Sequence, residues 1–276
     1  MLQRKVTKRL VKWKNESSKA LLVTGARQIG KSYAIREFGK SNYFCYFEVN
    51  LLLDKAAKST LASAESAVDF INRIALLSDV PLVEGDTLIF VDEIQEHPDI
   101  VTLMKALVED GRYSFVFSGS MLGTEFKGIS SFPVGYVEQI VMRPMDFEEF
   151  CWAMGLTESV WPMACDAARA REPLPDFLYD RLLGLFHRYM MVGGMPDAVS
   201  AFAESGNIDR VRAVHGNLHA LYRQDITKYA PEGLRLVVRD IYDLIPSELG
   251  SKNRRFKLSS IQGVKRFAQV TDHFLW

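Results

Sequence analysis

The glycine-rich segment at residues 25–32 constrains this chain more than any other part of it. It follows the apolar run at residues 21–23 and has the spacing Gly-x-x-x-x-Gly-Lys-Ser, from Gly25 to Ser32. This is the pattern of a strand, a tight turn and a helix, in which backbone N–H groups of the turn point inward at a phosphate. The helix dipole adds positive potential at the same place. The sequence therefore predicts a phosphate-binding loop, followed by a helix over residues 32–38.

Individual positions of this loop have specific expected roles. Gly25 and Gly30 let the backbone turn back on itself. Lys31 is expected to reach the β- and γ-phosphates of a nucleotide, and the Ser32 hydroxyl to ligate Mg²⁺. The alternative interpretation is an ordinary glycine-containing turn between a strand and a helix. The expected nucleotide-binding positions are Gly25, Ala26, Arg27, Gln28, Ile29, Gly30, Lys31 and Ser32.

A second informative segment, residues 87–93, ends in two carboxylates. Its apolar residues 88–91 predict an inner parallel strand that delivers Asp92 and Glu93 to the end of the sheet where α/β folds bind ligands. Asp92 is expected to hold Mg²⁺ through water, and Glu93 to polarise a water for in-line attack on the γ-phosphate. Alone, this pattern also fits a solvated strand end. Together with the glycine loop, it indicates ATP hydrolysis.

A further predicted strand at residues 113–117 ends in Ser118-Gly119-Ser120. A small polar side chain at such a strand tip could touch the attacking water or the γ-phosphate, the position called sensor 1. Ser118 or Ser120 could serve, and we take Ser118 as the catalytic candidate. The alternative, equally good for each serine, is that its hydroxyl only caps the following turn.

The remaining pattern predicts an α/β core followed by helices alone. The shift near residue 150 marks a domain boundary, and residues 123–135 are expected to form a mobile Gly/Ser-rich loop. Residues 2–14 should form an amphipathic helix with a solvated basic face. Further strands are predicted at residues 43–49 (buried) and 138–142, and further helices at residues 66–77, 100–109, 147–153, 177–191, 196–203, 208–229 and 234–244.

Composition restricts the class of protein. Lys plus Arg and Asp plus Glu both number 34, so net charge gives no general attraction to nucleic acid or membranes. The three cysteines are far apart and lack a metal-ligand spacing, which favours a reducing compartment with unpaired thiols. No apolar run reaches the length of a membrane span, and the start of the chain lacks a signal peptide. We therefore expect a cytoplasmic protein.

Gly193-Gly194-Met195-Pro196 interrupts the helical region. The glycines would end one helix, and Pro196 would begin the next at its first turn. This structural explanation is complete by itself. The functional alternative is that the flat backbone at Met195 and Pro196 packs on an adenine ring.

Taken together, these motifs resemble the AAA-type ATP-binding proteins with an archaeal-ATPase-like core, close to the signal-transduction ATPases with numerous domains. The resemblance implies a P-loop parallel sheet with an all-helical lid, with Lys31 and Ser32 on phosphate and Mg²⁺. It also implies that Asp92 and Glu93 form the Walker B pair. Gly194, Met195 and Pro196 match the adenine-contacting Gly-x-Pro of the lid. The similar stretches are residues 25–32, 90–95, 118–120, 144–150 and 193–196.

The resemblance also identifies two departures. Such proteins commonly continue through a winged helix into a further domain, whereas here residues 232–276 resemble only the beginning of a winged helix, so we expect a truncated form. Many relatives carry Gly-Arg before the fifth strand, where this chain has Gly135-Tyr136. No arginine finger is expected there. Arg143 lies after that strand, and Lys127 is a weak substitute.

The predicted organisation is an ATPase core at residues 1–150, a lid at 151–231 and a winged-helix segment at 232–276. The predicted function is Mg²⁺-ATP binding with slow hydrolysis to ADP and phosphate, which drives a conformational switch. One alternative is a nucleotide-dependent switch without turnover that acts on a protein partner. Another is a DNA-binding regulator that uses the basic residues Lys252, Arg254, Arg255 and Lys257. The partner and the oligomeric state are not predicted.

Overall fold

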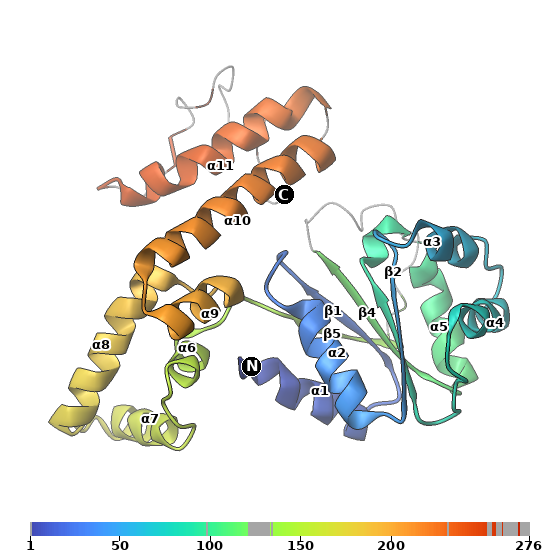
Figure 1. Cartoon of the computed structure of the whole chain (residues 1–276), viewed down its shortest axis with the longest axis horizontal. Coiled ribbons are helices and arrows are strands. Elements are labelled where there is room, and N and C mark those ends of the chain that lie inside the picture. The colour runs from blue at the N-terminus through green and yellow to red at the C-terminus, as the bar shows by residue number, and fades with distance from the viewer. Residues whose placement is uncertain are drawn as a thin grey trace. The chain divides into compact units, whose positions relative to one another are not determined.

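The structure of the chain is a computed structural model that describes residues 2–97, 99–120, 133, 135–230, 232–252, 256–257, 261 and 270 (Figure 1). The described residues form two compact units, of which the first ends at Asn207 and the second begins at Ile208. Within the described part of the chain, no helix combines the length and the apolar character that a bilayer crossing requires.

The first unit is built on a sheet of five strands: β1 (Ala20–Gly25), β2 (Cys45–Asn50), β3 (Thr87–Asp92), β4 (Ser114–Ser120) and β5 (Val137–Val141). Their order is β2-β3-β4-β1-β5, and every neighbouring pair is parallel. The carboxyl ends of all strands therefore meet at one edge of the sheet, where α/β folds bind ligands. At that edge, β4 separates β1, which leads into the glycine loop, from β3, which ends at Asp92.

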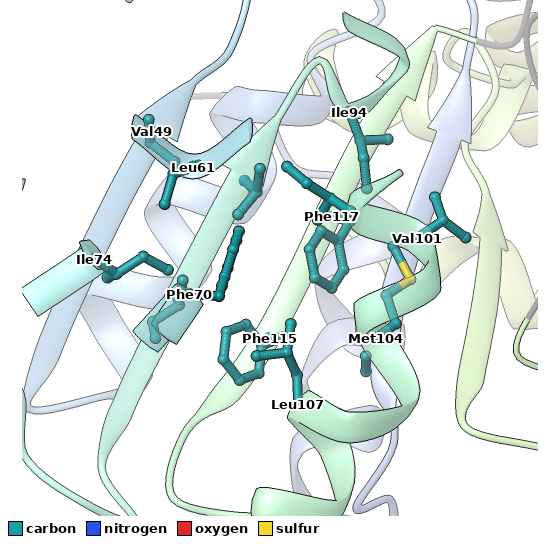
Figure 2. Close-up of a cluster of buried hydrophobic side chains, with 14 of the residues drawn as sticks. Val49, Leu61, Phe70, Ile74, Ile94, Val101, Met104, Leu107, Phe115 and Phe117 are labelled. Carbon is teal, nitrogen blue, oxygen red and sulfur yellow. The ribbon is translucent and has the colours of Figure 1, made fainter. Parts of the chain in front are cut away.

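Helices cover both faces of this sheet: α1 (Lys5–Glu16), α2 (Lys31–Asn42), α3 (Lys55–Ala62), α4 (Ala67–Leu77) and α5 (Ile100–Asp110). Helices α1 and α2 share one buried cluster with Leu21 of β1. Helices α3, α4 and α5 share the other with Leu22 (Figure 2). Neighbouring residues of one strand enter different clusters because successive side chains point to opposite faces. The predicted α/β sheet with flanking helices is confirmed.

The strand predicted over residues 43–49 is not buried as expected. It begins at Cys45, lies at an edge of the sheet, and buries only Cys45 and Val49. Glu48 on the same strand accepts two hydrogen bonds from Arg36 of α2, at 2.7 and 2.8 Å. An edge strand has a neighbour on one side alone, and its apolar sequence does not reveal that position.

Four helices of the first unit form the predicted all-helical region: α6 (Phe147–Ala153), α7 (Val160–Ala170), α8 (Asp176–Val192) and α9 (Pro196–Ser205). Helix α6 starts with a capping box between Asp146 and Glu149. The Phe147 ring lies 5.4 Å from the ring centroid of Phe186, which joins α6 to α8. The hydrophobic periodicity of the sequence did not predict α7, because this helix buries no residue. It did not predict the short α3 either.

The second unit contains α10 (Ile208–Tyr229) and α11 (Arg235–Gly250). Helix α11 was predicted to end at Leu244, yet it continues through Pro246 to Gly250. A proline inside a helix removes one hydrogen bond and can bend the helix without ending it. Most residues after Lys252 lie outside the described residues, so the winged-helix expectation stays a prediction. The same holds for the expected loop at residues 123–135, of which only Pro133 and Gly135 are described.

Candidate nucleotide-binding site

The glycine loop has the backbone conformation that its sequence predicts. Gly25 and Gly30 have positive φ angles of 146° and 84°, and Gln28 between them has a φ of 61°. A Cβ on Gly25 would lie 2.2 Å from the carbonyl oxygen of Met142, so only glycine fits there. Helix α2 then begins at Lys31. The strand, turn and helix of a phosphate-binding loop are therefore present.

Lys31 is buried beneath this loop. Its Nζ donates hydrogen bonds to the carbonyl oxygens of Gly25, at 2.9 Å, and Ala26, at 2.8 Å. Burial lowers the pKa of Lys31, and the nearby charges of Glu93 and Asp92 oppose that lowering. The ammonium group is thus held by the loop carbonyls, and it could exchange these partners for phosphate oxygens.

Asp92 joins three of the predicted site residues. Its Oδ2 accepts from the Ser32 hydroxyl at 2.7 Å, and its Oδ1 accepts from the Ser118 hydroxyl and from the Glu93 backbone N–H. A fourth donor is the Asn50 side-chain amide, 3.0 Å from Oδ2. Sequence reasoning missed Asn50. It ends β2 directly beside Asp92, and the parallel pairing of β2 with β3 would have identified it.

The Ser32 and Asp92 oxygens are hard donors of the kind that Mg²⁺ selects. Among the described residues, no group of three His, Cys, Asp or Glu side chains could form an all-protein metal cage. A hydroxyl and one carboxylate instead fit an ion that completes its shell with phosphate oxygens and water. These two residues could therefore supply part of the shell of a Mg²⁺ ion bound with a nucleotide.

The two serines of β4 have different partners. Ser118 is fully buried, and its hydroxyl donates to Asp92. Ser120, at the tip of the strand, accepts a hydrogen bond of 3.2 Å from the side-chain amide of Gln95. The same amide donates to the Glu93 carboxylate. Ser118 therefore belongs to the Asp92 cluster, and Ser120 belongs to the surroundings of Glu93.

Glu93 has a left-handed backbone conformation, with a φ of 56°. It stands between β3 and the single-turn helix η1 (Ile94–Glu96). A left-handed conformation is uncommon in residues other than glycine, and such positions concentrate at functional sites. This turn directs the Glu93 side chain away from the line of β3 and toward Gln95.

A cavity of about 510 Å³ lies beside the loop, within the first unit. It is bounded by the start of the chain, the glycine loop, α2 and the start of α9. Pro196 lines it, as the adenine interpretation expects, whereas Gly194 lies against Met145, whose carbonyl oxygen would be 2.1 Å from an added Cβ. The lining residues are Leu2, Arg4, Gln28, Gly30, Tyr33, Ala34, Pro196, Asp197 and Ser200.

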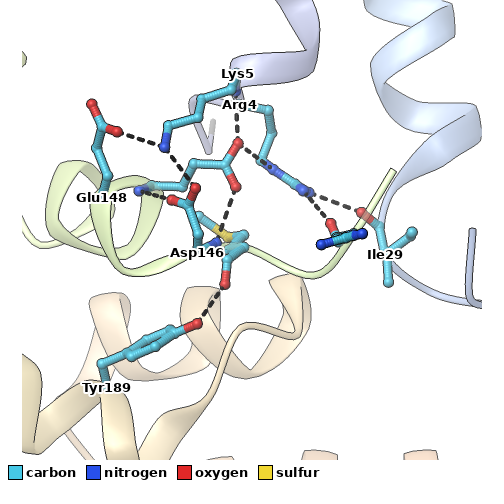
Figure 3. Close-up of polar contacts among 9 residues, drawn as sticks. Arg4, Lys5, Ile29, Asp146, Glu148 and Tyr189 are labelled. Carbon is cyan, nitrogen blue, oxygen red and sulfur yellow. Dashed lines mark hydrogen bonds and ion pairs between the residues drawn. The ribbon is translucent and has the colours of Figure 1, made fainter. Parts of the chain in front are cut away.

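Arg4 links the loop to the helical region (Figure 3). Its guanidinium donates to the carbonyl oxygens of Ile29, at 2.9 Å, and Arg143, at 2.7 Å. Its Nε lies 3.2 Å from the Glu149 carboxylate in α6. Lys5 likewise pairs with Asp146, at 2.6 Å. The Arg4 side chain, only 10% exposed, therefore departs from the expected solvated basic face, whereas Lys5 is paired but still 41% exposed.

The comparisons with known proteins agree with this geometry. Residues 17–151 match a family model described as an AAA domain, and residues 183–276 match one described as a domain of unknown function (DUF8612). No curated protein matches the sequence.

Among solved structures, the Walker-type ATPase PABY2304 of Pyrococcus abyssi has a similar fold. The TM-score is 0.56 at 13% identity, covering 100% of this chain and 89% of that one. The ORC1 protein of Aeropyrum pernix in complex with DNA has a TM-score of 0.43 at 14% identity, covering 99% and 84%. AMPPCP-bound DnaA from Aquifex aeolicus has a TM-score of 0.43 at 10% identity, covering 99% and 87%. With its match to an AAA domain at residues 17–151 and its five-stranded parallel sheet, this chain contains an AAA-type P-loop domain.

Proposed function

We propose that this protein binds ATP together with Mg²⁺ and slowly hydrolyses it to ADP and phosphate. The observation that carries the proposal is the 2.7 Å contact between Ser32, at the start of α2, and Asp92, at the end of β3. It brings together a hydroxyl and a carboxylate from segments 60 residues apart. Beside them, Lys31 offers a buried cation to the same ligand.

The chemistry follows from these positions. Backbone N–H groups of the loop and the Lys31 ammonium would bind the β- and γ-phosphates. Ser32 and Asp92 would hold Mg²⁺, which neutralises charge on the phosphates when it is bound. Glu93 would accept a hydrogen bond from the attacking water and orient it in line with the γ-phosphate. The adenine base would lie in the cavity at Pro196.

The nucleotide state would be transmitted to the lid. Arg4 contacts both the loop, at the Ile29 carbonyl, and α6, at Glu149. A change of loop conformation on hydrolysis would therefore alter the support of the first lid helix. This supports the proposed conformational switch.

A switch without turnover is the second candidate. It is favoured by Gly135-Tyr136, which stands where many similar proteins carry the Gly-Arg of an arginine finger. The Tyr136 hydroxyl donates a hydrogen bond to Glu109 at 2.9 Å, so its partner lies within the first unit. An arginine finger contributes strongly to phosphoryl-transfer rates, and its absence fits slow or negligible hydrolysis. A protein partner, and DNA contacts through the basic residues after position 251, stay predictions.

The test is Mg²⁺-dependent ATP binding and turnover by the purified protein and its Lys31→Ala and Glu93→Gln variants. Lys40→Ala, an exposed position on the same helix α2, and Glu84→Gln, an exposed carboxylate, are the controls. Binding that Lys31→Ala abolishes, with turnover that Glu93→Gln abolishes, is the expected result. Binding without turnover would favour the switch. A folded protein that does not bind ATP would contradict both candidates.

A further inference from the structure

We infer that Gln95 is a positioning residue that holds the Glu93 carboxylate toward the phosphate site by bridging it to Ser120 at the tip of β4. The inference rests on the proposed function, because it assigns Glu93 the role of orienting the attacking water. It concerns a residue that ends the similar stretch at residues 90–95 but to which the sequence assigned no role.

The hydrogen bonds of Gln95 define the bridge. Its Nε2 donates to Glu93 Oε2 and also, at 3.2 Å, to Ser120 Oγ. A side-chain amide carries two N–H donors, so both are used. One is directed at the carboxylate and the other at the neighbouring strand. Glu93 is thereby connected to β4, which lies between the two motifs of the site.

The environment of the Gln95 side-chain oxygen indicates that this residue does more than stabilise the fold. Its Oε1 is buried and has no hydrogen-bond partner among the described residues. A buried acceptor without a donor destabilises the folded state, and an apolar side chain would avoid that penalty. A polar residue kept here at such a disadvantage is typical of a functional site.

Gly119 provides the space for this arrangement. A Cβ on Gly119 would lie 2.7 Å from Gln95 Oε1, closer than the two atoms can approach. Because Oε1 is the far end of a flexible side chain, Gly119→Ala would displace the amide without removing any polar group. Gly119→Ala therefore disturbs the bridge from β4, while the Gln95 side chain itself is retained.

The bridge fixes where the carboxylate points. The Glu93 N–H donates to Asp92 Oδ1 at 3.0 Å, and Asp92 Oδ2 accepts from Ser32 of the loop, so a Glu93 side chain tied to β4 stays at the edge of the sheet beside the predicted phosphate position. A correctly placed general base contributes roughly 10²–10⁴-fold to rate, and small misplacements forfeit part of that. Loss of the bridge should lower kcat and leave ATP affinity unchanged, because Gln95 acts on Glu93, which is assigned to the attacking water and not to the binding of ATP.

The experiment compares Gln95→Ala, Gly119→Ala and their combination, each with Glu93 intact and in the Glu93→Gln background. The kcat of ATP hydrolysis is measured at saturating ATP and high protein concentration, so that low residual rates can be quantified, together with ATP affinity and melting temperature. Gln224→Ala, at an exposed position, and Gly184→Ala, at a helical glycine with open space around it, are the matched controls.

We expect each single variant to lower kcat by roughly tenfold and to change ATP affinity by less than about twofold. Gly119→Ala should add nothing to Gln95→Ala, because both remove the same bridge. In the Glu93→Gln background neither variant should lower the residual rate, since a positioning residue acts only through the group it positions.

Three outcomes would overturn the inference. One is a kcat for Gln95→Ala equal to or above that of the wild type. Another is an equal loss of rate in the Glu93→Gln background, which a general structural defect would produce. The third is a wild-type protein without turnover, which contradicts the proposed hydrolysis and this inference together. The first two leave the proposed function standing, so the two failures are distinguishable.

Discussion

Arg4 donates through Nη1 to the carbonyl oxygen of Ile29 over 2.9 Å, so a residue ahead of the first helix holds the backbone of the phosphate-binding loop. The same guanidinium contacts the Arg143 carbonyl and pairs with Glu149, which lies in the first turn of α6. One side chain thus joins three segments that are distant in sequence. A displacement of the loop would alter the contacts at the first lid helix.

This relationship predicts a large effect of Arg4→Ala. The free energy of unfolding should fall by about 3 kcal/mol, because the buried Glu149 carboxylate loses its cation. ATP affinity should also fall, because the Ile29 carbonyl loses its donor. Urea unfolding and calorimetric ATP titration measure the two effects. Arg9→Ala, at an exposed position of α1, is the control. Arg4→Ala and Arg9→Ala with equal stability would contradict the prediction.

Asn50→Ala should weaken Mg²⁺ binding in the presence of ATP. Asn50 donates to Asp92 Oδ2 at 3.0 Å and accepts from the backbone N–H groups of Leu52 and Leu53. Removing a residue that orients a metal ligand reduces metal affinity by roughly 10–100-fold. The measurement is a Mg²⁺ titration of ATP binding, with Asn72→Ala, exposed on α4, as the control. An unchanged Mg²⁺ midpoint would show that Asp92 does not need this donor.

Gly25→Ala should be among the most destabilising single substitutions in the loop. Its added Cβ would lie 2.2 Å from the backbone oxygen of Met142, which cannot move as a side chain could. Overpacking combined with an unfavourable φ should lower the free energy of unfolding by roughly 2–4 kcal/mol. Gly206→Ala separates the two causes, because Gly206 has a positive φ of 62° and open space around it. Thermal unfolding in which both variants lose equal stability would contradict the steric argument.

Cys151 should resist alkylation until strongly alkaline pH. Burial, followed by the charges of Asp146 and Glu148, raises the pKa of its thiol to about 12. Cys165 is only partly buried and should react first. Rates of thiol alkylation between pH 7 and pH 10, mapped by peptide mass analysis, test this order. Faster modification of Cys151 than of Cys165 in the folded protein would contradict it.

The same thiol links stability to pH. Because its pKa is higher in the folded than in the unfolded chain, the folded state holds the proton over a pH range in which the unfolded state releases it. The contribution of Cys151 is therefore fully present below the unfolded pKa and is lost as pH rises toward about 12. The Cys151→Ala variant should lose less stability than the wild type between neutral pH and pH 10, as measured by urea unfolding.

The two motifs of the candidate site could be predicted because each is local. The spacing from Gly25 to Ser32 and the apolar strand before Asp92 contain their own structural context. Their meeting in space follows from parallel strands that share a carboxyl edge. Ser118 could be singled out for the same reason, because it lies near the carboxyl end of β4, a third strand of that edge.

What sequence reasoning missed depends on pairing between distant segments. Arg4 and Asn50 are ordinary polar residues in the chain, and they become part of the site through partners 25 to 145 positions away. Gln95 lies two positions from Glu93, but its bridge depends on Ser120, 25 positions away. For a related reason, the sequence did not predict that β2 lies at an edge of the sheet or that α7 buries no residue. Periodicity reports which residues prefer burial, but it does not report which neighbours are present.

The two carbonyl partners of Lys31 have a consequence for the energetics of ligand binding. The ammonium is already fixed against Gly25 and Ala26, so its long side chain has few rotamers left to lose. A lysine side chain loses more conformational entropy on ordering than most side chains do. Here most of that loss occurs when the chain folds, before any ligand binds. A phosphate would then exchange one set of hydrogen-bond partners for another at a preorganised cation. ATP binding should accordingly have a favourable enthalpy and only a small ordering penalty at this position.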